Sequence, residues 1–156
     1  DSIKEHWGHV FERSAQPFDH AFFERDGFIY DTEPPSRAIV ALHSLAKDVS
    51  LAALKAVHRA FYAENRDVTD REVLADIAEE LGQDRDAFLT AFDLDDNRTA
   101  TQRGFDFSRS INVTGFPTLL AGDNDNGYRA LTQGYQSWED IQPALDAYLA
   151  EPEIQV

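Results

Sequence analysis

The sequence predicts a mostly helical chain that closes with a β-hairpin and one further helix. Through residues 1–110, apolar side chains recur at the three- and four-residue spacing of helices that bury one face. After residue 116 the pattern changes to two short apolar runs around an Asn-Gly pair, a dipeptide typical of tight hairpin turns. The chain has 156 residues, of which 42% are hydrophobic, which suffices for one domain with a substantial core.

The first expected helix lies in the segment SIKEHWGHVFERSA, residues 2–15. Ser2 and Glu5 have the spacing of a capping box, in which each side chain binds the backbone N–H of the other residue. The apolar residues expected on its inner face are Ile3, Trp7, Val10 and Phe11.

An aromatic loop is expected next, between Pro17 and the pair Pro34-Pro35. We expect its rings to fill the core beneath the loop, and the alternative is that they line a substrate groove. The rings belong to Phe18, Phe22, Phe23, Phe28 and Tyr30.

Two helices are expected after the proline pair, over residues 36–46 and 51–63. Each has a stripe of apolar residues at helical spacing, which predicts one buried face. The stripe of the first is Ile39, Val40, Leu42 and Leu45, and that of the second is Leu51, Leu54, Val57, Phe61 and Tyr62.

The segment TDREVLADIAEELG, residues 69–82, is the clearest helix in the sequence. Thr69 is the expected N-cap, Glu72 completes a capping box, and Gly82 ends the helix. A short helix is then expected from Asp84, and a longer one from Asp95 to about Ser110, interrupted by Gly104. The buried stripes of the first two are Val73, Leu74, Ile77, Ala78 and Leu81, and Phe88, Leu89 and Phe92.

The segments TLLAG and YRALTQG, residues 118–122 and 128–134, predict two strands joined by a turn at Asn126-Gly127. A final helix follows, capped at Ser137. Pro143 conflicts with that cap, so we expect its first turn to be irregular or the helix to begin later. Its inward residues are Ile141, Leu145, Tyr148 and Leu149, and residues 151–156 form a tail.

The composition excludes several classes of function. The net charge of -15 repels phosphate backbones and anionic lipids, so we expect neither nucleic-acid binding nor membrane binding. The sequence contains no cysteine, which excludes disulfides and thiol chemistry within these residues. It shows no secretory signal and no initiator methionine, so we expect it to begin partway into a longer protein or after processing.

Pro117 stands at the mouth of the first expected strand, although proline cannot donate a hydrogen bond inside a sheet. The order helix, Gly-Phe-Pro-Thr, strand, turn, strand, Gly, helix resembles the C-terminal half of a thioredoxin fold. Together with HWGHVFERSAQPF, GFIYDTEPPSRAIVAL and VHRAFYAENRDVTDREVLADIAEELG, the segment VTGFPTLL resembles the DsbA-like thiol-disulfide oxidoreductases, and among them the FrnE-like branch.

This resemblance implies an α/β, thioredoxin-like fold of the DsbA type with an all-helical insertion. Residues 1–110 would be the insertion and its connecting helix, and 111–150 the C-terminal half of the thioredoxin fold. It also implies a cis peptide bond before the loop proline, with the backbone of the preceding residues available to an extended substrate. The implied substrate-binding residues are Thr114, Gly115, Phe116, Pro117 and Thr118.

The family's reactive Cys-x-x-Cys pair lies in an N-terminal strand–helix–strand unit that these residues do not contain. We therefore expect a truncated or incompletely recorded oxidoreductase, with no catalytic residue of its own here. The resemblance implies a cytoplasmic protein that acts on a thiol or disulfide substrate, with glutathione as a redox partner and no bound cofactor. We also expect the sheet edge to be covered by the missing segment or by a second copy in a homodimer.

Two other functions remain open from the sequence. One is a non-catalytic, chaperone-like module that holds peptides. The other is a glutathione-dependent isomerase of the 2-hydroxychromene-2-carboxylate isomerase type, which shares the fold. The identity of the reactive residue in the N-terminal unit discriminates among the three.

No metal site is expected. His6 and His9 have helical spacing but lack a third ligand, so we interpret them as a polar helix face. The acidic segments 93–97 and 123–126 lack the glycine and twelfth-position acid of a calcium loop, and we interpret them as a helix cap and a turn.

Overall fold

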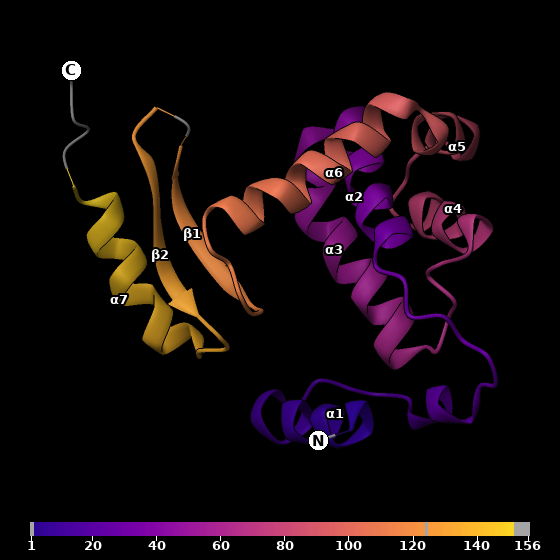
Figure 1. The fold of residues 1–156 in the computed structure, drawn as a ribbon, viewed down its shortest axis with the longest axis horizontal. Helices are drawn as coiled ribbons and strands as arrows, with labels where there is room; N and C mark the ends of the chain where they lie inside the picture. Colours follow the sequence, from indigo (N-terminus) through magenta and orange to yellow (C-terminus); the bar gives the residue numbers. More distant parts are fainter. Residues whose placement is uncertain (1, 124, 152–156) are drawn as a thin grey trace. The chain divides into compact units, whose positions relative to one another are not determined.

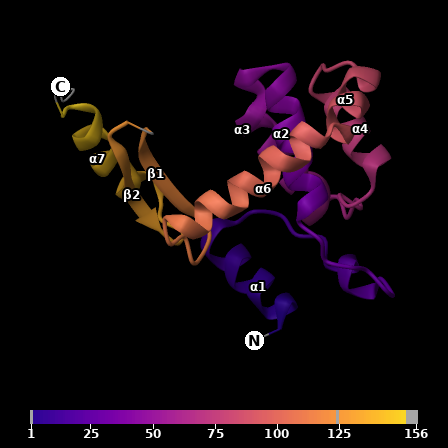
Figure 2. The ribbon, with the colours of Figure 1, turned by 45° about the horizontal axis from the view of Figure 1, so that its top comes forward.

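The computed structural model describes residues 2–123 and 125–151. The chain divides into two units, Asp1–Gly104 and Phe105–Val156. The first unit is helical, whereas the second contains the hairpin and the last helix, α7 (Figures 1 and 2). Most of the expected tail, residues 152–156, lies outside the described residues, as does residue 124 in the expected turn.

Helix α1, Ile3–Ser14, begins with the expected capping box. The Ser2 hydroxyl accepts from the Glu5 N–H, and the Glu5 carboxylate accepts from the Ser2 N–H at 2.7 Å. The expected inner face is only partly correct. Trp7 is 2% exposed, but Ile3 and Phe11 are 53% and 52% exposed. One large ring therefore anchors this helix to the first unit.

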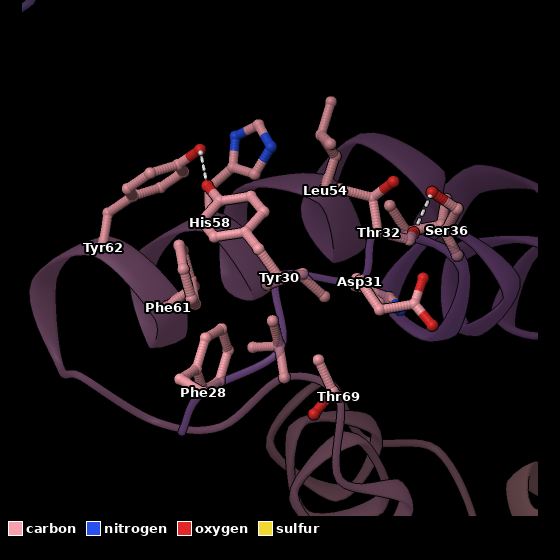
Figure 3. Close-up of a pocket in the computed structure, with 14 residues that line it drawn as sticks. Phe28, Tyr30, Asp31, Thr32, Ser36, Leu54, His58, Phe61, Tyr62 and Thr69 are labelled. Atoms are coloured by element: carbon pink, nitrogen blue, oxygen red, sulfur yellow. Dashed lines mark hydrogen bonds between the residues drawn. The ribbon is translucent and has the colours of Figure 1, made fainter. Parts of the chain in front are cut away.

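The aromatic loop packs around Trp7, as the core-filling interpretation expects. A short 3₁₀ turn, η1, His20–Glu24, brings Phe22 and Phe23 to ring-centroid distances of 5.2 and 4.8 Å from the indole. The prediction was wrong for Tyr30, which is 46% exposed and lines a pocket together with Phe28 (Figure 3).

Helix α2, Glu33–Leu45, begins three residues earlier than the sequence predicts. Pro34 and Pro35 lie within its first turn, where a missing N–H costs no intrahelical bond. The proline pair that was expected to bound the loop is therefore the start of the helix.

Helix α3, Ser50–His58, follows the 3₁₀ turn η2, Lys47–Val49, and continues into a π-helical turn, η3, Arg59–Ala63. Leu51 and Leu54 were expected to be buried, but they are 80% and 40% exposed. The stripe fails there because helix α3 packs through Ala53 and Val57, whereas the two leucines are exposed.

Helix α4, Arg71–Glu80, is capped by Asp70, whose carboxylate accepts from the Glu72 N–H at 2.8 Å. Thr69 was the expected cap, but its hydroxyl donates to Asp67 instead. Helix α5, Arg85–Asp93, is capped by Asp84 as expected.

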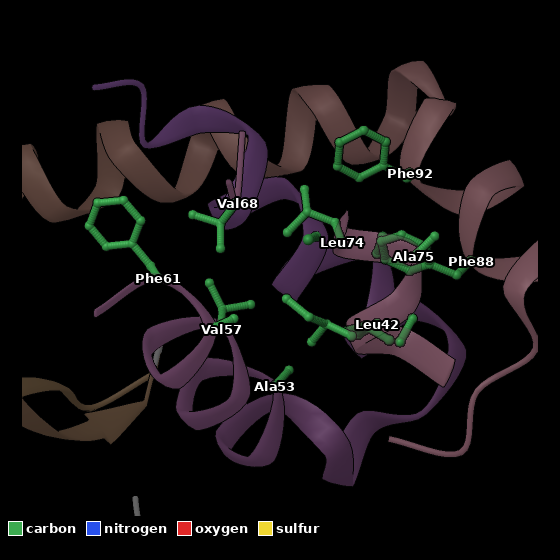
Figure 4. Close-up of a cluster of buried hydrophobic side chains, with 14 of the residues drawn as sticks. Leu42, Ala53, Val57, Phe61, Val68, Leu74, Ala75, Phe88 and Phe92 are labelled. Atoms are coloured by element: carbon green, nitrogen blue, oxygen red, sulfur yellow. The ribbon is translucent and has the colours of Figure 1, made fainter. Parts of the chain in front are cut away.

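The core of the first unit lies where helices α2, α3, α4 and α5 meet (Figure 4). Phe88 of helix α5 is fully buried, and Leu42, Leu74 and Ile77 are each 1% exposed. Burying these side chains stabilises the unit by about 1.5–3 kcal/mol per residue.

Helix α6, Asp95–Ser110, runs through Gly104 without the expected interruption. A glycine costs a helix interior only about 1 kcal/mol, which its neighbours can offset. Buried Asn97 helps to anchor its start by donating a 2.7 Å hydrogen bond to the Ala91 carbonyl.

Strands β1, Thr118–Asp123, and β2, Gly127–Gln133, form an antiparallel pair with a bulge between Leu119 and Leu120. The pairing ends with Asp123 opposite Gly127, so the two strands are not joined by the two-residue Asn126-Gly127 turn that the sequence predicts. The Asp123 carboxylate accepts from the Asn126 N–H at 2.7 Å, and these hydrogen bonds hold the pKa of Asp123 below its usual value.

Helix α7, Trp138–Leu149, contacts strand β2 and begins directly after Ser137, so the irregular or later start that the sequence predicts was wrong. Pro143 lies inside the helix, where it cannot donate the hydrogen bond to the carbonyl four residues earlier. Its expected inward residues are not fully covered, and Leu149 is 68% exposed. No helix in the described ranges is both long enough and apolar enough to cross a bilayer.

Candidate functional site: the loop before strand β1

The candidate site is the loop of residues 111–117, between helix α6 and strand β1. Its first part is a helix-ending turn in which the Val113 N–H donates to the Ser108 carbonyl at 3.0 Å. Asn112 supplies the left-handed residue this turn requires, with φ of 59°. The turn ends helix α6 and leads the chain into the Gly-Phe-Pro-Thr segment.

Two hydrogen bonds fix the loop at Pro117. The Pro117 carbonyl accepts from the Gly134 N–H at 2.8 Å, which ties it to the end of strand β2. The Thr118 hydroxyl donates to the Gly115 carbonyl at 2.8 Å. The Phe116–Pro117 peptide bond is cis.

The residues just before Pro117 are exposed, and their backbone N–H groups are unpaired within the described residues. Phe116 is 84% exposed. Within residues 2–123 and 125–151, no hydrogen bond uses the backbone N–H of Thr114, Gly115 or Phe116. A short stretch of fixed backbone with unused donors can pair with an extended chain in the manner of an added strand.

A hollow of about 180 Å³ lies beside this loop. Thr114, Gly115, Phe116 and Thr118 line it, so the structure brings four of the five expected site residues to one cavity. The side chains around it are all uncharged, which suits a neutral peptide backbone rather than an anionic group.

The residues that the hairpin contributes to this hollow were not predicted from the sequence. Leu120 of strand β1 and Ala130 of strand β2 line it, as do Gln133 and Gly134 at the end of strand β2. The pairing of Thr118 with Gln133 brings these residues beside the loop. The sequence does not reveal this register. The bulge between Leu119 and Leu120 shifts the strand pairing by one residue, so cross-strand partners cannot be assigned by counting from the turn.

The site contains no reactive thiol, because none of the 156 residues is a cysteine. Over the described ranges, no three His, Cys, Asp or Glu side chains are grouped to hold a metal ion. A thiolate nucleophile would have to come from outside these residues.

The geometry of this loop and hairpin agrees with the comparison to known families. A family model for the DsbA-like thioredoxin domain matches residues 6–146. The chain belongs to the DsbA-like family. The resemblance to the DsbA-like family and the predicted fold class are thereby confirmed.

Two solved proteins show how closely the fold agrees. A candidate protein disulfide isomerase from Nitrosomonas europaea is 31% identical, with a TM-score of 0.89 over 94% of this chain and 72% of that chain. The cytosolic disulfide reductase DsbM from Pseudomonas aeruginosa is 24% identical, with a TM-score of 0.79 over 94% of this chain and 75% of that one. DsbM with GSH gives 25% identity and a TM-score of 0.76, over 97% of this chain and 78% of that chain. No curated protein matches the chain.

Proposed function

We propose that these residues form the substrate-holding part of a thiol-disulfide oxidoreductase of the DsbA-like family, in its FrnE-like branch. The observation that carries the proposal is the loop before strand β1. Its backbone N–H groups at Thr114, Gly115 and Phe116 are unpaired in the described part of the chain, and its carbonyl at Pro117 is fixed to Gly134. Membership of the family supports the assignment.

In this proposal the backbone of Thr114 to Phe116 pairs with an extended segment of the substrate that contains a cysteine or a disulfide. Phe116 provides apolar contact beside that segment, since its ring is 84% exposed. Pro117 and Thr118 hold the loop in place. The thiolate that attacks the disulfide belongs to the family's Cys-x-x-Cys unit, and exchange then proceeds through a mixed disulfide.

Glutathione is the proposed small-molecule redox partner, and the cytoplasm is the proposed location. Both proposals draw on the structural neighbour DsbM, which is described as a cytosolic disulfide reductase and in one structure is accompanied by GSH. We also propose residues 1–110 as the helical insertion and 111–150 as the C-terminal part of the thioredoxin fold.

Binding of an extended peptide to the 156-residue chain tests the proposal. Titrating the ¹⁵N-labelled protein with a heptapeptide that contains an S-methylated cysteine should shift the amide signals of Thr114, Gly115 and Phe116. Thr114→Pro removes one backbone N–H donor and should weaken binding of the peptide about five-fold, the change expected when one hydrogen bond is lost. Thr114→Ala keeps the donor and should bind as the wild type does.

Equal binding by the Thr114→Pro and Thr114→Ala variants would contradict backbone pairing at this loop. Peptide-induced shifts confined to the first unit would place the binding site elsewhere. The alternative function, a peptide holder without catalysis, predicts the same binding, and the identity of the reactive residue in the family's N-terminal unit separates it from the oxidoreductase.

A further inference from the structure

The first unit contains a second cavity, which the proposed function does not use. It has a volume of about 190 Å³ and lies between the end of the aromatic loop, helix α2 and the α3–η3 segment. Figure 3 shows Tyr30, His58 and Tyr62 grouped along one side and Phe28 and Phe61 along another. All of its lining residues belong to the unit Asp1–Gly104.

The cavity has the size of a single aromatic ring. An engineered cavity of about 150 Å³ lined by apolar side chains binds benzene, so 190 Å³ accommodates one ring with a small substituent. The walls suit such a ring, because Phe61 stands at 89° to Tyr30, with ring centroids 5.5 Å apart. An edge-to-face wall of this kind offers both ring faces and ring edges to a ligand ring.

The cavity also offers a pair of hydroxyl groups at its exposed edge. The hydroxyl oxygens of Tyr30 and Tyr62 are 3.5 Å apart. Hydroxyl pairs normally lie about 2.7–2.8 Å apart, so this hydrogen bond is weak. Only one of the two protons can point between the oxygens, and the other remains for a ligand oxygen.

Charge selects against an anionic ligand. The carboxylate of Asp31 lies on the cavity wall, and the chain as a whole carries a net charge of -15. Partial desolvation lowers the pKa of His58, which lines the cavity, and this disfavours a positive charge on its imidazole. No lysine or arginine lines the cavity among the described residues.

Two further features distinguish this cavity from a packing gap. Phe61 and Tyr62 reach it from the π-helical turn η3, in which the Glu64 N–H donates to the Arg59 carbonyl at 3.1 Å. Such turns interrupt α-helices frequently at functional sites. Leu54, which lines the cavity, is 40% exposed, and Ile29, between the lining residues Phe28 and Tyr30 in the chain, is 79% exposed. Exposed apolar side chains around a concave site are typical of binding surfaces.

We propose that this cavity binds an uncharged, single-ring aromatic molecule that carries a hydrogen-bonding oxygen, with the ring against Phe28 and Phe61 and the oxygen at the hydroxyls of Tyr30 and Tyr62. Phenol is the simplest probe of this class. Its lining residues belong to a different unit from the loop at Pro117, and its ligand is of a different class, so the proposal goes beyond the proposed function.

The test is a titration of the ¹⁵N-labelled 156-residue chain with phenol, benzene and benzoate at pH 7. Phenol should bind saturably, with amide shifts centred on Tyr30, Phe61 and Val68, and more tightly than benzene. Benzoate, which is anionic, should give no saturable shifts in this region.

Two variants locate the ligand. The double change Tyr30→Phe and Tyr62→Phe keeps both rings and removes only the hydroxyls, so it should weaken phenol about five-fold and leave benzene unchanged. Leu54→Trp places a large side chain at the mouth and should abolish binding of both. Because Leu54 is 40% exposed, this change leaves the core intact. Tyr148→Phe, on helix α7, is the matched control and should bind phenol as the wild type does.

Three results would overturn the proposal. One is the absence of saturable phenol binding, and another is binding that Leu54→Trp leaves unchanged. The third is a set of shifts at these residues that depends on protein concentration alone, since this would identify a second copy of the chain as the occupant. A loss of peptide binding at Thr114 to Phe116 would not bear on this cavity, so the two proposals fail separately.

Discussion

Among single residues, Arg37 shows how this fold buries a charge. Its side chain is 7% exposed, and its guanidinium carbon lies 3.9 Å from the centroid of the Phe92 ring. It donates to the Phe92 carbonyl at 3.0 Å and pairs with Glu33, one helical turn earlier, at 2.9 Å. A planar guanidinium can stack and donate at the same time, which an ammonium group cannot do. Arg37 thus links helix α2 to the end of helix α5.

Replacing Arg37 by methionine should lower the free energy of unfolding by about 2–3 kcal/mol, because the Phe92 carbonyl loses a charged donor. Arg59 pairs with Glu64 at 2.8 Å, but its side chain is 63% exposed. Arg59→Met is therefore the control and should cost less than about 1 kcal/mol. Urea unfolding followed by circular dichroism measures both. Equal losses for the two variants would contradict a structural role for the buried guanidinium.

Single residues also show where the sequence was ambiguous. Thr69 and Asp70 are both favourable N-cap residues. In the structure the Thr69 N–H donates to the Asp67 carboxylate, and Asp70 caps helix α4. Tyr30 looks like core in the sequence because it is aromatic. Its exposure depends on how helices α2 and α3 pack, and these helices contact each other only after folding. Local patterns do not contain that information.

At the scale of elements, helices α4 and α5 are joined by a cluster of ion pairs. Arg85, the first residue of helix α5, donates to Asp76 at 2.5 Å, to Glu72 at 2.7 Å and to Glu79 at 2.9 Å. The hydrogen bond from Arg85, followed by that from Arg71, holds the pKa of Glu72 below its usual value of 4.5. Because these groups are exposed, the cluster responds to salt and pH.

This cluster should make the first unit sensitive to acid. A carboxylate whose pKa is lower in the folded than in the unfolded state stabilises the fold above its unfolded pKa, and that stabilisation is lost as the pH falls through the folded pKa. For Glu72 the loss therefore begins near pH 4.5 and continues below it. Urea midpoints measured from pH 7 to pH 3 should fall less steeply for Glu72→Gln than for the wild type. Identical pH profiles would show that Glu72 does not contribute.

The elements themselves could be predicted from the sequence to different degrees. Caps and apolar stripes placed helices α1, α4 and α5 to within two residues, although Asp70 rather than Thr69 caps α4, because those signals are local. Helix α7 was harder to predict, since Pro143 suggests a break in the helix. The helix nevertheless continues through Pro143. The π-helical turn at Arg59–Ala63 was not predicted, because one additional residue per turn leaves no periodic signal in so short a segment.

At the scale of the whole molecule, the sequence revealed the family and part of the site. The ordered segments around Gly-Phe-Pro-Thr carried the resemblance, and the family match over residues 6–146 agrees with it. The sequence offered a groove along the aromatic loop only as the alternative, and it did not predict that Tyr62 joins Tyr30 at the cavity, because residues 32 positions apart meet only in the folded unit. The hairpin wall of the loop was missed for the same reason.

The central claim is that this chain holds the substrate of a disulfide exchange whose cysteines it does not contain. The most direct test fuses a Cys-x-x-Cys unit of the family to residue 1 and measures insulin reduction with glutathione. In each cycle the dithiol reduces one insulin disulfide and becomes oxidised, and two glutathione molecules restore it while forming glutathione disulfide. The controls are the unfused chain and the isolated unit, together with the fused Thr114→Ala variant.

The account predicts that the unfused chain is inactive and that the fused chain turns over faster than the isolated unit. Thr114→Pro in the fused chain should lower kcat/KM about five-fold through the lost backbone hydrogen bond, while Thr114→Ala stays near the wild type. A folded fusion that is no faster than the isolated unit, or equal rates for the proline and alanine variants, would contradict the assignment of the loop at Pro117 as the substrate-holding site.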